Sequence, residues 1–74
     1  MTIVHTDTRA SRLLRTTRQR AGMTQQQVAD AAGMTRSHYS LVELGLSGIA
    51  PEKACRLAVI LGLTLDELYG REVA

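Results

Sequence analysis

Few side chains in this 74-residue chain are suited to catalysis or metal binding. His5, His38 and Cys55 are the only strong transition-metal ligands, and their separation does not match a zinc site. Asp66 and Glu67 are adjacent, so they point in different directions and do not form a catalytic carboxylate pair. The sequence has no glycine-rich phosphate loop, and so short a chain does not easily enclose a substrate pocket. We therefore expect no enzyme, no metal site and no cofactor.

The side chains best suited to bind a ligand lie between residues 36 and 41. Arg36 can donate two hydrogen bonds to the edge of a guanine. Ser37 and Ser40 can bond to bases or phosphates, and Leu41 can pack on the methyl group of thymine. This set of residue types predicts contacts with double-stranded DNA.

Two short helices are predicted to position these side chains. Residues 25–31 and 36–44 each follow a threonine, and Gly33 lies between the two segments. Apolar residues recur at helical spacing in both segments: Val28, Ala29 and Ala32 in the first, Tyr39 and Val42 in the second. At about 100° per residue, the potential DNA-contacting residues and Leu44 lie opposite Tyr39, Val42 and His38. Two short helices joined by such a turn form a helix-turn-helix, whose second helix can enter the major groove.

The remaining sequence predicts three more helices. Asp7 or Thr8 can cap a first helix that runs to about Ala21, and Pro51 suits the first turn of a helix that Gly62 ends. Thr64 and Glu67 form a capping-box pattern for a short last helix, and residues 46–50 are expected to form a loop. We predict an all-α fold, a compact five-helix bundle, with a flexible tail at 1–8, one domain at 9–70 and a C-terminal tail at 71–74.

Three motifs carry a family resemblance. They are Gly-Met-Thr-Gln-Gln-Gln-Val-Ala at 22–29, Thr35-Arg36-Ser37 followed by Val42-Glu43-x-Gly45, and Leu-Ala-x-x-Leu-Gly-Leu-Thr-Leu-Asp-Glu-Leu at 57–68. Together they resemble the DNA-binding domain of Cro and the C1-type phage repressors, the XRE family. The resemblance spans about residues 10 to 69. It implies the phage-repressor type of helical bundle and a sequence-specific, repressor-like transcriptional regulator that reads a palindromic operator.

The resemblance also implies roles for single residues. The family glutamine that matches Gln25 typically anchors a phosphate at the start of its helix, where backbone amides favour anions. The residues that match Arg36, Ser37 and Leu41 typically supply base contacts, and Thr35, at the start of the recognition helix, is expected to bind DNA with them. The pair that matches Arg18 and Glu43 often forms a buried ion pair, whose disruption leaves an uncompensated charge.

Positive charge is concentrated in the half that holds the helix pair. The net charge is +2. Residues 1–40 carry six arginines against two aspartates, a net +4, and residues 41–74 carry three basic against five acidic residues, a net −2. Neutralising DNA phosphates needs such a basic half, although a solvated arginine-rich helix would have the same composition.

The sequence departs from the family after the recognition helix. The family usually has Lys or Arg at the position of Leu46, whereas Leu44, Leu46 and Ile49 are all apolar here. They are either scattered surface residues or a contact site for a protein. The second reading suggests an alternative function, a protein-interaction module such as an antitoxin or partner-binding regulator that uses the 44–49 loop.

A DNA-reading domain of this size is expected to act as a homodimer, because one copy contacts about half of an operator. The expected seam lies on the last two helices, which carry more apolar residues than they can bury: Val59, Leu63, Leu65, Leu68 and Tyr69. The loop at 44–49 is the second candidate for the seam.

Other features of the sequence bear on location. A single cysteine excludes an intramolecular disulfide, and no signal peptide or membrane-spanning run occurs, so a cytoplasmic protein without membrane contact is expected. The sequence leaves three points open. They are the operator sequence, whether binding represses or activates transcription, and whether the protein is a phage or mobile-element repressor or a restriction–modification or toxin–antitoxin controller.

Overall fold

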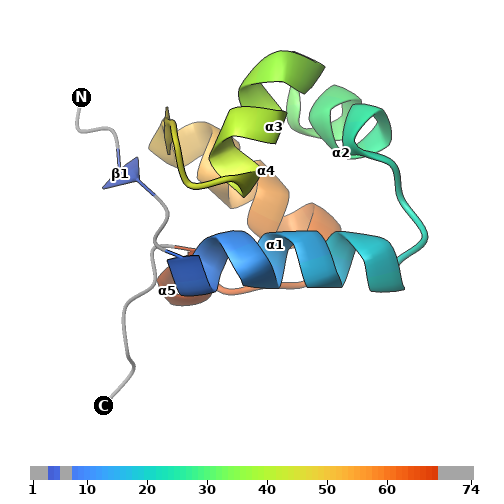
Figure 1. Ribbon diagram of the computed structural model, residues 1–74, viewed down its shortest axis with the longest axis horizontal. Helices are drawn as coiled ribbons and strands as arrows, with labels where there is room; N and C mark the ends of the chain where they lie inside the picture. The colour runs from blue at the N-terminus through green and yellow to red at the C-terminus, as the bar shows by residue number, and fades with distance from the viewer. Residues whose placement is uncertain (1–3, 6–7, 69–74) are drawn as a thin grey trace.

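The computed structural model describes residues 4–5 and 8–68 of the chain (Figure 1). In chain order the elements are β1 (Val4–His5), α1 (Thr8–Arg20), α2 (Gln25–Ala32), α3 (Arg36–Glu43), β2 (Gly48–Ile49), α4 (Pro51–Leu61) and α5 (Leu65–Leu68). Five helices within the described residues confirm the predicted all-α fold class. The helix predicted over 25–31 ends one residue later, and the helix predicted over 36–44 ends one residue earlier.

Threonine caps define where the short helices begin. The Thr24 hydroxyl accepts from the amide of Gln27, and the Gln27 side-chain oxygen accepts from the amide of Thr24, at 3.1 and 2.8 Å. Thr64 and Glu67 repeat this reciprocal pair before α5. Each pair satisfies two amides that the first turn of a helix leaves without partners. The predicted capping box at Thr64 is confirmed.

One core joins the helices. α2 packs on both α3 and α4, and α1 packs on α3 and α5 (Figure 1). The largest fully buried side chains come from every helix and from β2: Leu14, Val28, Tyr39, Val42, Ile49, Leu57 and Leu68. Because the chain has no phenylalanine or tryptophan, Tyr39 is the bulkiest group in this core.

A short antiparallel strand pair differs from the prediction. Val4 pairs with Ile49 and His5 pairs with Gly48, so these residues are not in a tail and an open loop as expected. Each strand has two residues, too few to show an alternating pattern in the sequence. The pairing depends on the fold, which brings the two segments together although they are far apart in the chain.

Candidate nucleic-acid interface

The two faces of α3 differ sharply in exposure. Tyr39 and Val42 are completely buried and Glu43 is 6% exposed. The predicted contact residues lie on the other face and at its start: Thr35, Arg36 and Ser37 are exposed, Leu41 is 43% exposed, and Ser40 is half-buried. We call these five residues the recognition face. The structure brings them together on one short helix whose other side is fixed in the core.

Two local features fix the start of α3. Gly33 ends α2 in the left-handed region, at φ 72°, and its amide bonds back to Ala29 and Asp30 carbonyls. The Thr35 hydroxyl then accepts from the amide of His38 at 3.1 Å. Left-handed backbone favours glycine because it has no side chain to clash with the next carbonyl. The turn therefore sets the direction in which α3 leaves α2.

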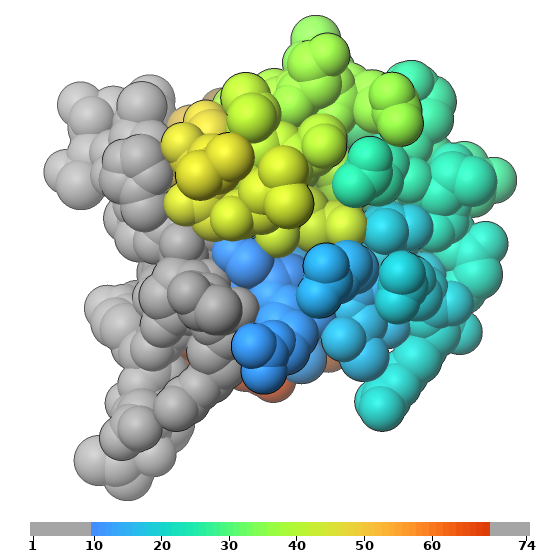
Figure 2. Space-filling model, viewed as in Figure 1, coloured from blue at the N-terminus to red at the C-terminus, as the bar shows by residue number. Residues whose placement is uncertain are grey.

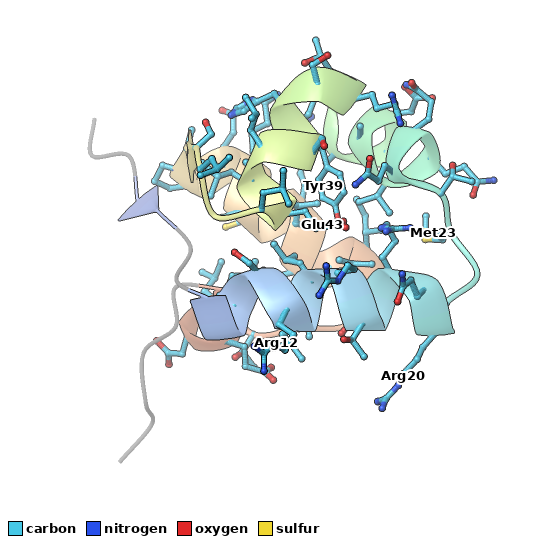
Figure 3. The ribbon with its side chains drawn as sticks, in the orientation of Figure 1. Arg12, Arg20, Met23, Tyr39 and Glu43 are labelled. Carbon is cyan, nitrogen blue, oxygen red and sulfur yellow. The ribbon has the colours of Figure 1, made fainter. Side chains whose placement is uncertain are left out.

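A buried ion pair ties the end of α3 to α1. The Arg18 Nε donates to Glu43 Oε2 at 2.9 Å and Arg18 Nη2 donates to Glu43 Oε1 at 3.0 Å. The remaining nitrogen, Nη1, donates to the Met23 carbonyl at 2.9 Å. The two side chains are 12% and 4% exposed. Figure 3 shows Glu43 and Tyr39 on the side of α3 that faces α1. This bidentate geometry is the strong form of an arginine–carboxylate pair.

Gln25 joins the same network. Its side-chain Nε2 donates to Glu43 Oε1 at 3.3 Å, so the first residue of α2 contacts the last residue of α3. The side chain is half-buried. The structure thus gives Gln25 a partner inside the protein, and its predicted role as a phosphate anchor stays a prediction.

These contacts change the acidity of three groups. Burial alone would raise the pKa of Glu43, but the hydrogen bonds from Arg18 and Gln25, together with the nearby Tyr39 hydroxyl, outweigh burial and lower it. The hydrogen bond to Glu43 raises the pKa of Arg18 against the opposing effect of burial. Burial, and then the neighbouring Glu43, raise the pKa of Tyr39. Glu43 and Arg18 are therefore charged and Tyr39 is neutral at pH 7.

The hydroxyl of Tyr39 is poorly satisfied. It is buried, and within the described part of the chain no group meets hydrogen-bond geometry with it, although Glu43 and Arg18 are its polar neighbours. The hydroxyl therefore lies near the Arg18–Glu43 pair without a formed bond to it.

The apolar surface after α3 is smaller than predicted. Leu44 and Leu46 are 60% and 71% exposed, but Ile49 is 1% exposed and belongs to the core. Including Ile49 in a possible protein-contact site is therefore wrong. Ile49 lies in β2, where its side chain packs inward.

The residues of the expected dimer seam fall into different environments. Val59 is 84% exposed and Leu65 is 37% exposed, whereas Leu63 packs partly on the core. Leu68 is 1% exposed, so it supports the core and is not available to a partner. Tyr69 lies outside the described residues. Val59 also borders a shallow, largely apolar groove between α2 and α4, lined by Ala31, Cys55, Arg56 and Ile60.

A second crevice lies between α1 and the end of α3, and the sequence did not suggest it. Ser11, Arg12, Arg15, Glu43 and Leu44 line it. Figure 2 shows the atoms of α1, in blue, directly beside those of residues 40–47, in yellow-green, on one face of the molecule. Helical spacing places Ser11, Arg15 and Arg18 on one stripe of α1, but only the contact with α3 makes that stripe the wall of a crevice.

Neither a metal site nor a membrane-spanning helix is found in the described part of the chain. No group of three or more His, Cys, Asp or Glu residues there could hold a metal ion. None of the helices that the structure describes has the length and apolar character needed to cross a bilayer.

A comparison with known families identifies the arrangement. Residues 9–69 match the family model described as a helix-turn-helix domain. This match includes α2, the Gly33 turn and α3. A search of curated proteins gave no match. Since the family model covers most of the chain, the protein belongs to the helix-turn-helix domain family.

Proposed function

We propose that this protein is a sequence-specific transcriptional regulator of the Cro/C1-type (XRE) group, which inserts α3 into the major groove of an operator. Membership of the helix-turn-helix family indicates a DNA-binding regulator. The repressor role and the closer relation to Cro and the C1-type repressors are our inference from the sequence motifs.

The observation that carries this proposal is the division of α3 into two faces. Tyr39 and Val42 fix one face in the core, while Arg36, Ser37 and Leu41 are presented to solvent. The major groove is wide enough to admit an α-helix, and a bidentate arginine contact specifies guanine. Such a helix can discriminate bases, because the backbone that carries its contact residues is already ordered before binding.

The proposed complex contains two copies on a palindromic operator. Recognition helices in such dimers lie about 34–36 Å apart, one turn of DNA. We place the seam on the face that exposes Val59 and Leu65, because it carries the most exposed large apolar side chain of the described residues. Leu63, which packs partly on the core, is the third residue of this proposed seam.

Selection of bound sequences from a random DNA pool tests the proposal. The wild-type protein should enrich a two-fold symmetric motif. Arg36→Ala should lose preference at one base pair in each half-site, worth about 1–3 kcal/mol for the correct base. Gln25→Ala serves as the comparison: if Gln25 anchors a phosphate, its loss weakens all sequences alike. A thermal melt of this variant checks that loss of the bond to Glu43 has not unfolded the domain. An unchanged motif in the Arg36 variant would exclude that residue from base reading.

A protein-interaction module is the second candidate, and the exposure of Leu44 and Leu46 favours it. The affinity of a DNA binder falls linearly with salt concentration on logarithmic axes. If mixed-sequence DNA shows no salt-dependent binding and the random pool yields no motif, the second candidate replaces the first.

A further inference from the structure

The end of the recognition helix lacks an obvious phosphate contact. Leu44 and Leu46 occupy this region and neither can bond to a phosphate. The eight residues of α3 span about 12 Å, close to the width of about 12 Å of the major groove. An α3 inserted into a groove of this width therefore has its ends near the sugar–phosphate strands that border the groove.

The crevice between α1 and α3 continues the recognition face at this end. Leu44 lies on the same side of α3 as Ser40 and Leu41, and it also lines the crevice beside Arg12 and Arg15. DNA lying along α3 would therefore pass over these two arginines. Figure 2 shows α1 and the end of α3 on one continuous face.

The charges in the crevice favour an anion. Arg12 and Arg15 are exposed, and neither forms an ion pair with another described residue. Among the described residues that line the crevice, Glu43 is the one acid, and Arg18 donates to both of its oxygens. Within the described part of the chain, no acid thus pairs with the positive charge of Arg12 or Arg15.

We propose that Arg15, with Arg12 at the outer lip, binds a backbone phosphate of the DNA strand that passes the end of α3. This inference rests on the proposed function and assigns to α1 a contact that the apolar 44–46 segment cannot make. Arg15 lies on the stripe of α1 that contains Arg18, which already reaches α3, whereas Arg12 leaves α1 on its outer side (Figure 3). An arginine can hold a phosphate with two parallel hydrogen bonds.

The test is the salt dependence of binding to a selected operator and to mixed-sequence DNA. Each phosphate contact contributes about 0.9 to the slope of log affinity against log salt. Arg15→Gln should lower the slope by about 0.9 for each bound copy, which is about 1.8 for the proposed dimer. The Arg12→Gln, Arg15→Gln double variant should lower it by up to about 1.8 for each copy if each arginine neutralises its own phosphate, with equal effects per copy on both DNAs. Thermal melts should show unchanged stability, because both side chains are exposed.

Arg20→Gln is the matched control. It removes the same charge from the same helix, but Arg20 extends from the far end of α1, away from α3 (Figure 3). The proposal fails if Arg20→Gln and Arg15→Gln lower the slope equally, or if neither changes it while wild-type protein binds its operator. Absence of any salt-dependent binding by the wild-type protein would instead overturn the proposed function, and the phosphate site with it.

Discussion

At the scale of residues, Glu43 joins three helices, since from α3 it accepts from Arg18 in α1 and from Gln25 in α2. Removing one partner of a buried pair leaves a desolvated charge, so Arg18→Met or Glu43→Gln should each destabilise the fold by about 3–5 kcal/mol. The double variant should lose clearly less than the sum, because it leaves neither charge behind. Chemical denaturation of the three variants and the wild type measures the coupling.

The dependence of stability on pH tests the Arg18–Glu43 pair independently. An unfolded glutamate titrates near pH 4.3, and the folded pKa of Glu43 is lower. The stabilisation is therefore complete above about pH 5 and is lost as the pH falls through the folded pKa. The difference between wild type and Glu43→Gln should shrink below about pH 4. Small, additive and pH-independent losses would show that the pair contributes little.

The buried hydroxyl of Tyr39 leads to a prediction at the other end of the pH scale. Its folded pKa is raised, whereas an unfolded tyrosine titrates near pH 10, so wild-type protein should lose stability as the pH rises above about 10. Tyr39→Phe should lack this part of the alkaline loss. At pH 7 it should change the free energy of unfolding by less than about 1 kcal/mol, since the hydroxyl has no formed bond to lose within the described residues. A large loss at pH 7 would show that the hydroxyl does bond to the Arg18–Glu43 pair.

At the scale of elements, the turn between α2 and α3 depends on the backbone of Gly33. Gly33→Ala should cost about 1–2 kcal/mol, because alanine is strained at positive φ. A new Cβ would lie 2.7 Å from Arg56 Nη1, the flexible end of a side chain that can move away. The loss should therefore persist in an Arg56→Ala background, as thermal melts can measure. If Arg56→Ala removes most of the loss, crowding and not backbone strain is the cause.

At the scale of the whole molecule, the proposed dimer depends on an exposed apolar face that the monomer does not use. Val59→Glu should give folded monomers by analytical ultracentrifugation, because Val59 is 84% exposed and burying a charge in a seam is costly. Binding to a full operator should weaken much more than binding to a half-site. Leu46→Glu, at a side chain 71% exposed, is the matched control and should leave a dimer. Monomers from Leu46→Glu and dimers from Val59→Glu would move the seam to the 44–46 segment.

The sequence by itself determined the features that neighbouring residues control. Thr24, Thr35 and Thr64 cap helices through bonds to amides three residues ahead, so the beginnings of α2, α3 and α5 could be predicted. Helical periodicity, which also depends only on residues close in the sequence, separated buried Tyr39 from exposed Arg36. The two faces of α3 were therefore predictable before any contact between helices was known.

Tertiary structure decided what depends on residues distant in the chain. Ile49 and Leu68 looked like available surface, but β1, α1 and α4 meet at their positions and both are buried in the core. The bond from Gln25 to Glu43 and the crevice beside Arg15 likewise exist only because α1, α2 and α3 converge. An apolar side chain is buried, and a charge is compensated, only where the fold brings another part of the chain against it. A single sequence does not specify which part that is.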